Sequence, residues 1–232
     1  NLPGAWDKAT GAGVTVAVLD TGYRPHVDLN ANILQGYDMI SNVSVANDGG
    51  GRDSDARDPG DAISANECGY THGAQNSSWH GTHVAGTVAA VTNNGEGVAG
   101  VAYNSKVVPV RVLGKCGGLT SDIADGIIWA SGGSVSGVPA NANPADVINM
   151  SLGGSGSCSS TTQSAINQAR NNGSVIVIAA GNDNDNSANY NPGNCNGVVN
   201  VASVGRNGGR AYYSNYGSNI DVAAPGGAQS FS

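Results

Sequence analysis

The sequence is poor in charge, in aromatic side chains and in long apolar runs. Of its 232 residues, 12% are charged and 5% are aromatic, and the net charge is −7. Nucleic acids and anionic membranes bind clustered Lys and Arg, so we expect neither as a partner. No apolar run approaches the roughly 20 residues that span a bilayer. The first residues, Asn1 to Gly4, have no charged or apolar leader, which predicts that any signal peptide has been removed.

Glycine, by contrast, is abundant, with 36 residues, as is typical of a compact fold with tight turns. Short β-branched runs alternate with helical patterns. This alternation predicts one α/β domain over residues 1–232, a doubly wound, mainly parallel sheet with helices on both faces. The predicted strands, each buried on both faces, are 13–19, 106–112, 146–150, 174–179, 198–204 and 220–222. The predicted helices are 83–90, 121–130 and 160–171, the last two capped by Thr120 or Ser121 and by Ser159 or Ser160.

Four cysteines indicate the compartment in which the chain folds. None forms a CxxC pair or lies at zinc-finger spacing from a His, so a metal cluster is not expected. Two disulfides would place the protein outside a reducing cytosol, and the alternative is four buried free thiols. Of the three possible pairings, closure of the shortest loops favours Cys68–Cys116 and Cys158–Cys195.

Two polar residues stand where predicted strands end. Asp20 directly follows an apolar strand and precedes a sharp turn, and Asn182 follows the strand 174–179. Each has an ordinary explanation as a turn residue, and Asp20 also as a helix cap. An Asn in this position can also donate its side-chain NH₂ into a cleft. Because the carboxyl ends of parallel strands meet at one edge, where such sheets hold their active sites, we interpret both residues as candidate site residues.

A histidine-containing helix follows, with the sequence HGTHVAGTVAA from His80. Glycines at 81 and 86 cost a helix roughly 1 kcal/mol each, which indicates that its backbone closely approaches another element. His80 and His83 are three residues apart, a spacing that could suit zinc. However, no Glu lies between them and no third ligand is evident, so we do not expect a zinc site.

Together these segments carry a family resemblance. LDTG, HGTHVAGT and AAGN occur in this order, with VLG, NMSLG and VAAPG at 112–114, 149–153 and 222–226. They closely resemble the signatures of the subtilisin-like serine proteases (subtilases) of the secreted bacterial type, and the resemblance runs from about Gly11 to Pro225. It implies peptide-bond hydrolysis by an Asp-His-Ser triad. In that reading Asp20 orients the imidazole, His80 is the general base, Asn182 is the oxyanion-hole donor, and His83 is structural.

The resemblance also implies how substrate binds. A peptide would lie extended between two backbone segments of this chain, Gly117-Gly118-Leu119 and Ser151-Leu152-Gly153. Leu119 and Leu152 would add apolar surface to the outer pockets. The pocket for P1, the residue before the scissile bond, would have walls of small residues that leave a roomy and mostly uncharged slot, which predicts broad specificity with a preference for apolar or large P1 side chains. These walls correspond to Ser151, Leu152, Gly153, Ala179, Ala180 and Gly181.

Calcium is the expected cofactor, with two candidate sites. The first resembles the family's calcium loop after the catalytic His, and its ligands would be side-chain oxygens of Asp28 and Asn94 with carbonyls of Thr92, Glu96 and Val98. The second is an acidic loop in which five carboxylates would repel one another unless a cation gathers them. The alternative is a solvated loop balanced by Arg52 and Arg57. The five carboxylates are Asp48, Asp53, Asp55, Asp58 and Asp61.

The family's nucleophilic serine has no counterpart in this sequence. Ser230 and Ser232 lack both the motif and the helix that the serine requires, so we reject them as nucleophiles. We expect a truncated domain, or one nicked after Pro225, whose separate C-terminal remainder carries the serine and packs against this part. Intact-mass analysis under denaturing conditions would then detect a second fragment. Other expected partners are protein or peptide substrates and, during maturation of a zymogen, a propeptide.

Two other functions remain open from the sequence. A catalytically inactive subtilase-like module could bind peptides in the same cleft, and a structural calcium-binding domain could use the acidic loop. The retained Asp20, His80 and Asn182 argue against both.

Overall fold

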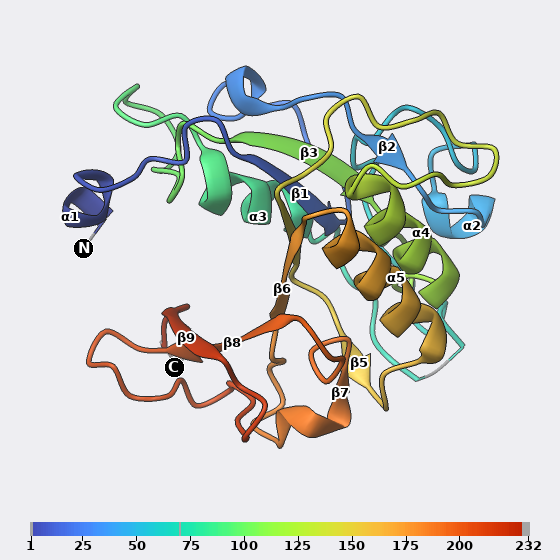
Figure 1. The fold of residues 1–232 in the computed structure, drawn as a ribbon. Coiled ribbons are helices and arrows are strands. Elements are labelled where there is room, and N and C mark those ends of the chain that lie inside the picture. Colours follow the sequence, from blue (N-terminus) through green and yellow to red (C-terminus); the bar gives the residue numbers. More distant parts are fainter. Residues whose placement is uncertain (1, 70, 229–232) are drawn as a thin grey trace.

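The computed structural model describes residues 2–69 and 71–228, so Ser230 and Ser232 lie outside the described residues. A seven-stranded sheet runs through the molecule in the order β2-β3-β1-β4-β6-β8-β9, and every neighbouring pair is parallel (Figure 1). The predicted parallel α/β sheet is therefore confirmed. The strands are β1 Thr15–Asp20, β2 Tyr37–Asp38, β3 Lys106–Arg111, β4 Val147–Met150, β6 Val175–Ala179, β8 Val199–Val204 and β9 Val222–Pro225.

Helices cover both faces of the sheet. Alternation along β1 sends Val16 and Val18 toward α3, and Ala17 and Leu19 toward α4 and α5. These three helices are α3 His80–Ala89, α4 Thr120–Ala130 and α5 Ser160–Asn171. The shorter elements are α1 Leu2–Trp6, α2 Val43–Ala46, the 3₁₀ turns Asn30–Asn32 and Ser187–Asn189, and a two-stranded antiparallel sheet of β5 Gly154–Ser155 and β7 Tyr190–Asn191.

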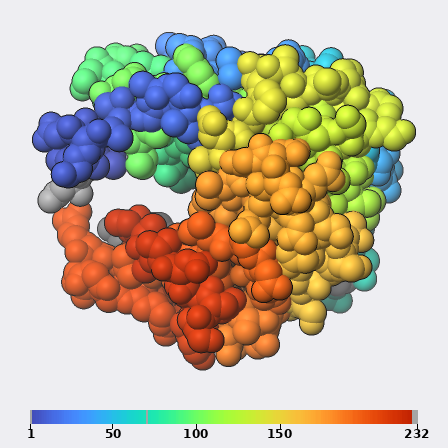
Figure 2. All heavy atoms as spheres, in the orientation of Figure 1, coloured from blue at the N-terminus to red at the C-terminus, as the bar shows by residue number. Residues whose placement is uncertain are grey.

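The end of the sheet formed by β6, β8 and β9 is less covered than the sequence predicts. Val175 and Val222 are each 49% exposed, and all four residues of β9 are exposed. Helix α3 packs on β1 and β3, so within the described residues it leaves this end open. A hollow of about 320 Å³ lies there, lined by residues that include Val177, Val201 and Ala224. Figure 2 shows the opening between the amino-terminal segment and the carboxyl-terminal strands. The prediction of strands buried on both faces is wrong for this end.

The helix starts differ in part from the predicted ones. Helix α3 begins at His80, three residues early, after Trp79 in the left-handed conformation with φ 51°. The predicted cap of α5 is confirmed, because the Ser159 hydroxyl accepts the Thr162 N–H. The predicted cap of α4 is wrong, since Leu119 precedes that helix without a side-chain cap. Tertiary contacts fix this helix start instead, through buried Asp122, which accepts bonds from other segments.

Both predicted disulfides are present. Cys68 is bonded to Cys116 and Cys158 to Cys195. Each bridge joins neighbouring cysteines of the sequence, so the loop-closure argument selected the right pairing. Among the described residues, no helix is long and apolar enough to cross a membrane.

Candidate active site

The site begins at the carboxyl end of β1. Asp20 ends this strand with its side chain fully buried, and His80 begins α3 with its side chain 46% exposed. His80 Nδ1 lies 2.8 Å and 2.9 Å from the two Asp20 carboxylate oxygens. The strand end thus holds a buried carboxylate against an imidazole whose other side faces the surface.

The carboxylate changes the acidity of the imidazole. Its hydrogen bond raises the pKa of His80 above the ordinary value of 6.5, although partial burial of the ring acts to lower it. Asp20 therefore stabilises the protonated imidazole and fixes which ring nitrogen carries the inner proton. These are the two properties that a general base needs from its partner.

Close packing explains one of the two helix glycines. A Cβ at Gly81 would lie 2.1 Å from the Gly22 carbonyl oxygen and 3.2 Å from Asp20 Cβ. Only glycine therefore lets α3 start against the turn that follows Asp20. Gly86 is different, because its nearest contact would be an ordinary 4.0 Å from Val98. The predicted close approach holds for Gly81 alone.

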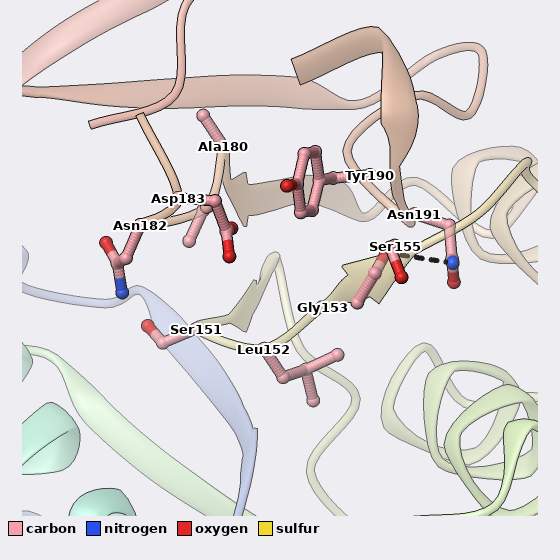
Figure 3. A pocket seen from close by; sticks show the side chains of 12 residues that line it. Ser151, Leu152, Gly153, Ser155, Ala180, Asn182, Asp183, Tyr190 and Asn191 are labelled. Carbon is pink, nitrogen blue, oxygen red and sulfur yellow. Dashed lines mark hydrogen bonds between the residues drawn. The ribbon is translucent and has the colours of Figure 1, made fainter. Parts of the chain in front are cut away.

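Asn182 follows the carboxyl end of β6, and β4 lies between β6 and β1 in the sheet. The turn into it contains Gly181 with φ 107°, and Asn182 is exposed. It borders a hollow of about 500 Å³ whose opposite side is formed by Ser151 and Leu152 (Figure 3). All six predicted wall residues of the P1 pocket line this hollow, namely Ser151, Leu152, Gly153, Ala179, Ala180 and Gly181.

Sequence reasoning missed part of the same wall. Asp183 and Tyr190 face the hollow from the side opposite Leu152 (Figure 3), so one carboxylate borders a slot that was predicted to be mostly uncharged. Tyr190 and Asn191 form β7, which pairs with β5, and no local pattern signals such a short long-range pairing. Asp183 directly follows the AAGN motif, and that adjacency was the available signal.

Two further hollows extend the cleft. One, of about 410 Å³, is lined by residues that include His80, Gly117 and Ser151, and the other, of about 440 Å³, by residues that include Gly117, Gly118 and Leu152. The two predicted substrate segments thus border one cleft that begins at His80. Leu119 lies outside the lining of these hollows and is 48% exposed, so the structure does not bring it into a pocket.

The first candidate calcium loop is assembled around Asp28. Its carboxylate is buried and accepts bonds from Asn94 Nδ2 over 2.7 Å and from the Val98 N–H over 2.9 Å. The Val98 N–H and the Asn94 amide hold the pKa of Asp28 below its usual value. In the same loop the buried Thr92 hydroxyl oxygen has no hydrogen-bond partner among the described residues. The Asp28 carboxylate and the unsatisfied Thr92 oxygen are both hard donors that suit a hard cation. Asn94 differs from the prediction, because it turns its nitrogen toward Asp28 while its oxygen accepts the N–H of the exposed Glu96 over 3.2 Å.

In the second candidate loop, each of the five carboxylates has a polar partner within the protein. Asp48 pairs with Arg111 at 3.1 Å, and Asp55 pairs with Arg57. Arg52, proposed to balance the loop, instead pairs with Asp122 and Asp125 of α4. Asp53 accepts the N–H of Asp55, Asp58 accepts the hydroxyl of Thr21, and Asp61 accepts the hydroxyl of Ser78.

Four of these carboxylates border a hollow of about 470 Å³, which Arg24 and Arg57 also line. Across residues 2–69 and 71–228, no group of three or more His, Cys, Asp or Glu side chains is placed to hold a metal ion. Separate polar partners, several of them far along the chain, therefore account for the acidic loop.

A parallel sheet with an acid–imidazole pair and a cleft at the carboxyl ends of its strands is the arrangement of an α/β enzyme. Residues 11–232 match the model of the Subtilase family, and the chain belongs to that family.

Named relatives agree with this assignment. The chain is 65% identical to an "Extracellular protease" of Xanthomonas campestris, covering 97% of this chain and 39% of that protein. It is 54% identical to an "Extracellular basic protease" of Dichelobacter nodosus, covering 95% of this chain and 38% of that protein. A solved structure of proteases from Pseudoalteromonas arctica is 91% identical with a TM-score of 0.98, covering 100% of this chain and 68% of that one. The chain thus spans about two fifths of these two curated relatives.

Proposed function

We propose that this chain forms the larger part of the catalytic domain of a secreted subtilisin-like serine endopeptidase of broad specificity. The observation that carries the proposal is the contact of buried Asp20 with His80 at the head of an open cleft. In this mechanism His80 Nε2 removes the proton of the serine hydroxyl and later gives it to the leaving amine. Asp20 keeps the inner proton on Nδ1, and the Asn182 amide donates to the developing oxyanion.

The serine is proposed to lie on the remainder of the same protein, packed over the open end of the sheet. The hollow beside β6, β8 and β9, bordered by Ser151 and Asn182 as well as by strand residues, supports this placement. The lengths of the relatives also support it, since each extends well beyond the part that this chain matches. The remainder would cover the exposed apolar strand residues and bring the hydroxyl toward His80.

The substrate is proposed to be an extended peptide. Gly117 and Ser151 border the hollow next to His80, which supports binding between the segments that contain them. The P1 side chain would enter the 500 Å³ hollow beside Asn182. This hollow is large enough for a bulky side chain, and the Asp183 carboxylate adds one charge to a lining that is otherwise uncharged.

Secretion and maturation from a zymogen complete the proposal. Both curated relatives are named extracellular, and two disulfides are compatible with an oxidising compartment. A propeptide removed during maturation would be a further partner.

The decisive experiment uses the full-length protein with casein. We expect hydrolysis that stops after treatment with a serine-directed sulfonyl fluoride or phosphonate, because the proposed nucleophile would be blocked. Hydrolysis that resists these reagents but stops with a metal chelator would contradict the serine mechanism. Binding of casein-derived peptides without any cleavage would instead favour an inactive peptide-binding module.

Calcium at the Asp28 loop is proposed as a structural cofactor. Asp28, Asn94 and the carbonyls of Thr92, Glu96 and Val98 would hold it through oxygen atoms alone. A cation there would neutralise a buried carboxylate and tie the loop after α3 to the turn after β1.

Removal of calcium is expected to lower thermal stability. A cation at 100 times its Kd contributes about 2.7 kcal/mol, which corresponds to a fall in Tm of about 5–10 °C for a chain of this size. An Asp28→Asn variant is expected to start from the lower Tm and to lose little more when chelator is added. Asp7→Asn, at an exposed position, serves as the matched control. An unchanged Tm of the wild type in chelator would contradict the site.

A further inference from the structure

The acidic loop lies directly against the turn that follows Asp20. The Tyr23 N–H donates to the Ala56 carbonyl over 3.2 Å, and the Asp58 N–H donates to the Tyr23 carbonyl over 2.8 Å. A Cβ at Gly22 would lie 2.5 Å from the Ala56 carbonyl oxygen. The loop is therefore bonded to this turn in the manner of an added strand, with no room between them.

Thr21 connects this loop to both members of the acid–imidazole pair. Its N–H donates to Asp20 Oδ1 over 2.7 Å, and its hydroxyl lies 2.8 Å from Asp58 Oδ2. The Gly81 N–H, at the first turn of α3, donates to the same hydroxyl oxygen over 3.0 Å. Because a backbone N–H can only donate, the Thr21 hydroxyl accepts from Gly81 and directs its own proton to Asp58.

Asp58, which accepts the bond from the Thr21 hydroxyl, is a buried carboxyl group. It is 2% exposed, and its other oxygen, Oδ1, accepts the Gly60 N–H over 2.7 Å. Its direct hydrogen bonds thus come from neutral groups, and its burial raises its pKa. Burying a carboxyl group is costly unless its oxygens are satisfied. Here both oxygens accept a bond, and one of these bonds fixes the orientation of the Thr21 hydroxyl.

We propose that Asp58 and Thr21 are positioning residues for the Asp20–His80 pair. Asp58 holds the Thr21 hydroxyl so that its lone pair faces Gly81, and Thr21 thereby sets the start of α3 relative to the Asp20 carboxylate. Neither residue touches the reacting atoms. The role rests on the proposed peptidase function, and it gives the acidic loop a task that needs no bound cation.

The test compares Thr21→Val with Thr21→Ser in the full-length protein. Valine keeps the shape but removes the hydroxyl, and a displacement of about 1 Å at a catalytic group can cost about 10²-fold in rate. We expect Thr21→Val to lower kcat about 10- to 100-fold with KM changed less than about twofold, because valine keeps the shape of the side chain where it lines the hollow next to His80. Thr21→Ser is expected to recover most of the loss. Thr10→Val, which removes a hydroxyl bonded to Asn104, is the matched control.

A second measurement does not depend on activity. We expect the proton between His80 Nδ1 and Asp20 to give a far-downfield NMR signal that shifts or broadens in Thr21→Val and stays in place in Thr21→Ser. A wild-type kcat and an unmoved signal in Thr21→Val would overturn the proposal. So would a lower Tm with kcat and signal both preserved, since that result assigns Thr21 to stability alone.

If Thr21→Val fails to fold, the Asp58→Asn variant tests the positioning role instead. Asp58 accepts one bond on each of its two oxygens, and asparagine replaces one oxygen by an NH₂ donor, so we expect kcat to fall about fivefold and the signal to move. Unchanged values overturn the proposal. If the wild type cleaves no peptide under any condition, the proposed function fails, while the NMR comparison still tests the positioning role.

Discussion

Replacing His80 by alanine is expected to lower kcat on peptide substrates by about 10⁴-fold or more while the protein stays folded. Members of a catalytic triad act as a unit, so loss of the base removes most of what the triad contributes. The control is His83→Ala on the same helix, because His83 is exposed and three residues from the Asp20 contact. Steady-state kinetics on a chromogenic peptide measures both. Substantial turnover in His80→Ala would contradict the assignment of the base.

The pH profile of the wild type checks the same pair. His80 acts as a base only when its Nε2 is unprotonated, and the hydrogen bond that it donates to Asp20 raises its pKa above 6.5. Turnover should therefore be full at alkaline pH and be lost as the pH falls through this raised pKa. An acidic limb well below pH 6.5 would mean that Asp20 does not act on the imidazole as the geometry indicates.

The largest expected loss of stability comes from Arg111→Met. Arg111 is 1% exposed and pairs with fully buried Asp38, and it also donates to the carbonyls of Ala46 and Thr21. Removing one partner of a buried ion pair leaves the other uncompensated and costs about 3–5 kcal/mol. We expect the Tm to fall by about 10–15 °C, measured with a serine-directed inhibitor present so that self-digestion does not contribute.

The loss in this variant should depend on pH. Burial raises the pKa of Asp38 to about 7 although Arg111 acts to lower it, and without Arg111 the pKa rises further. The folded state then binds a proton more tightly than the unfolded state, so stability falls as the pH rises. The deficit should be smaller at pH 5 than at pH 8. Arg206→Met, at an exposed position, should change stability by less than about 0.5 kcal/mol. A loss of less than about 0.5 kcal/mol in Arg111→Met would contradict the role assigned to the buried Arg111–Asp38 ion pair.

The elements that sequence reasoning found are those with local signals. Asp20 and Asn182 could be singled out because Asp20 ends an apolar strand and Asn182 follows another after two small residues, and the parallel topology then brings strand ends to one edge. The Ser159 cap was found by the same kind of local pattern. The start of α3 was missed because Trp79 precedes it in a left-handed conformation without a capping side chain.

What the sequence could not supply are pairings between distant segments. Tyr190 lines the hollow beside Asn182 from a two-residue strand pairing that leaves no periodic pattern. The acidic loop suggested a cation because its neighbours in the sequence offer two arginines for five carboxylates. In the structure Arg111, 63 residues after Asp48, supplies a further positive charge, and hydroxyl groups from other segments satisfy Asp58 and Asp61.

The connectivity of the two disulfides bears on how an exported chain reaches its fold. During export the amino-terminal end emerges first, so Cys116 becomes available to Cys68 before either later cysteine has crossed the membrane. Cys158 then meets Cys195 in the same way. Disulfide reshuffling takes seconds to hours, whereas pairing each cysteine with the next one to appear needs no reshuffling. For these four cysteines, the order in which they emerge therefore favours the native bridges.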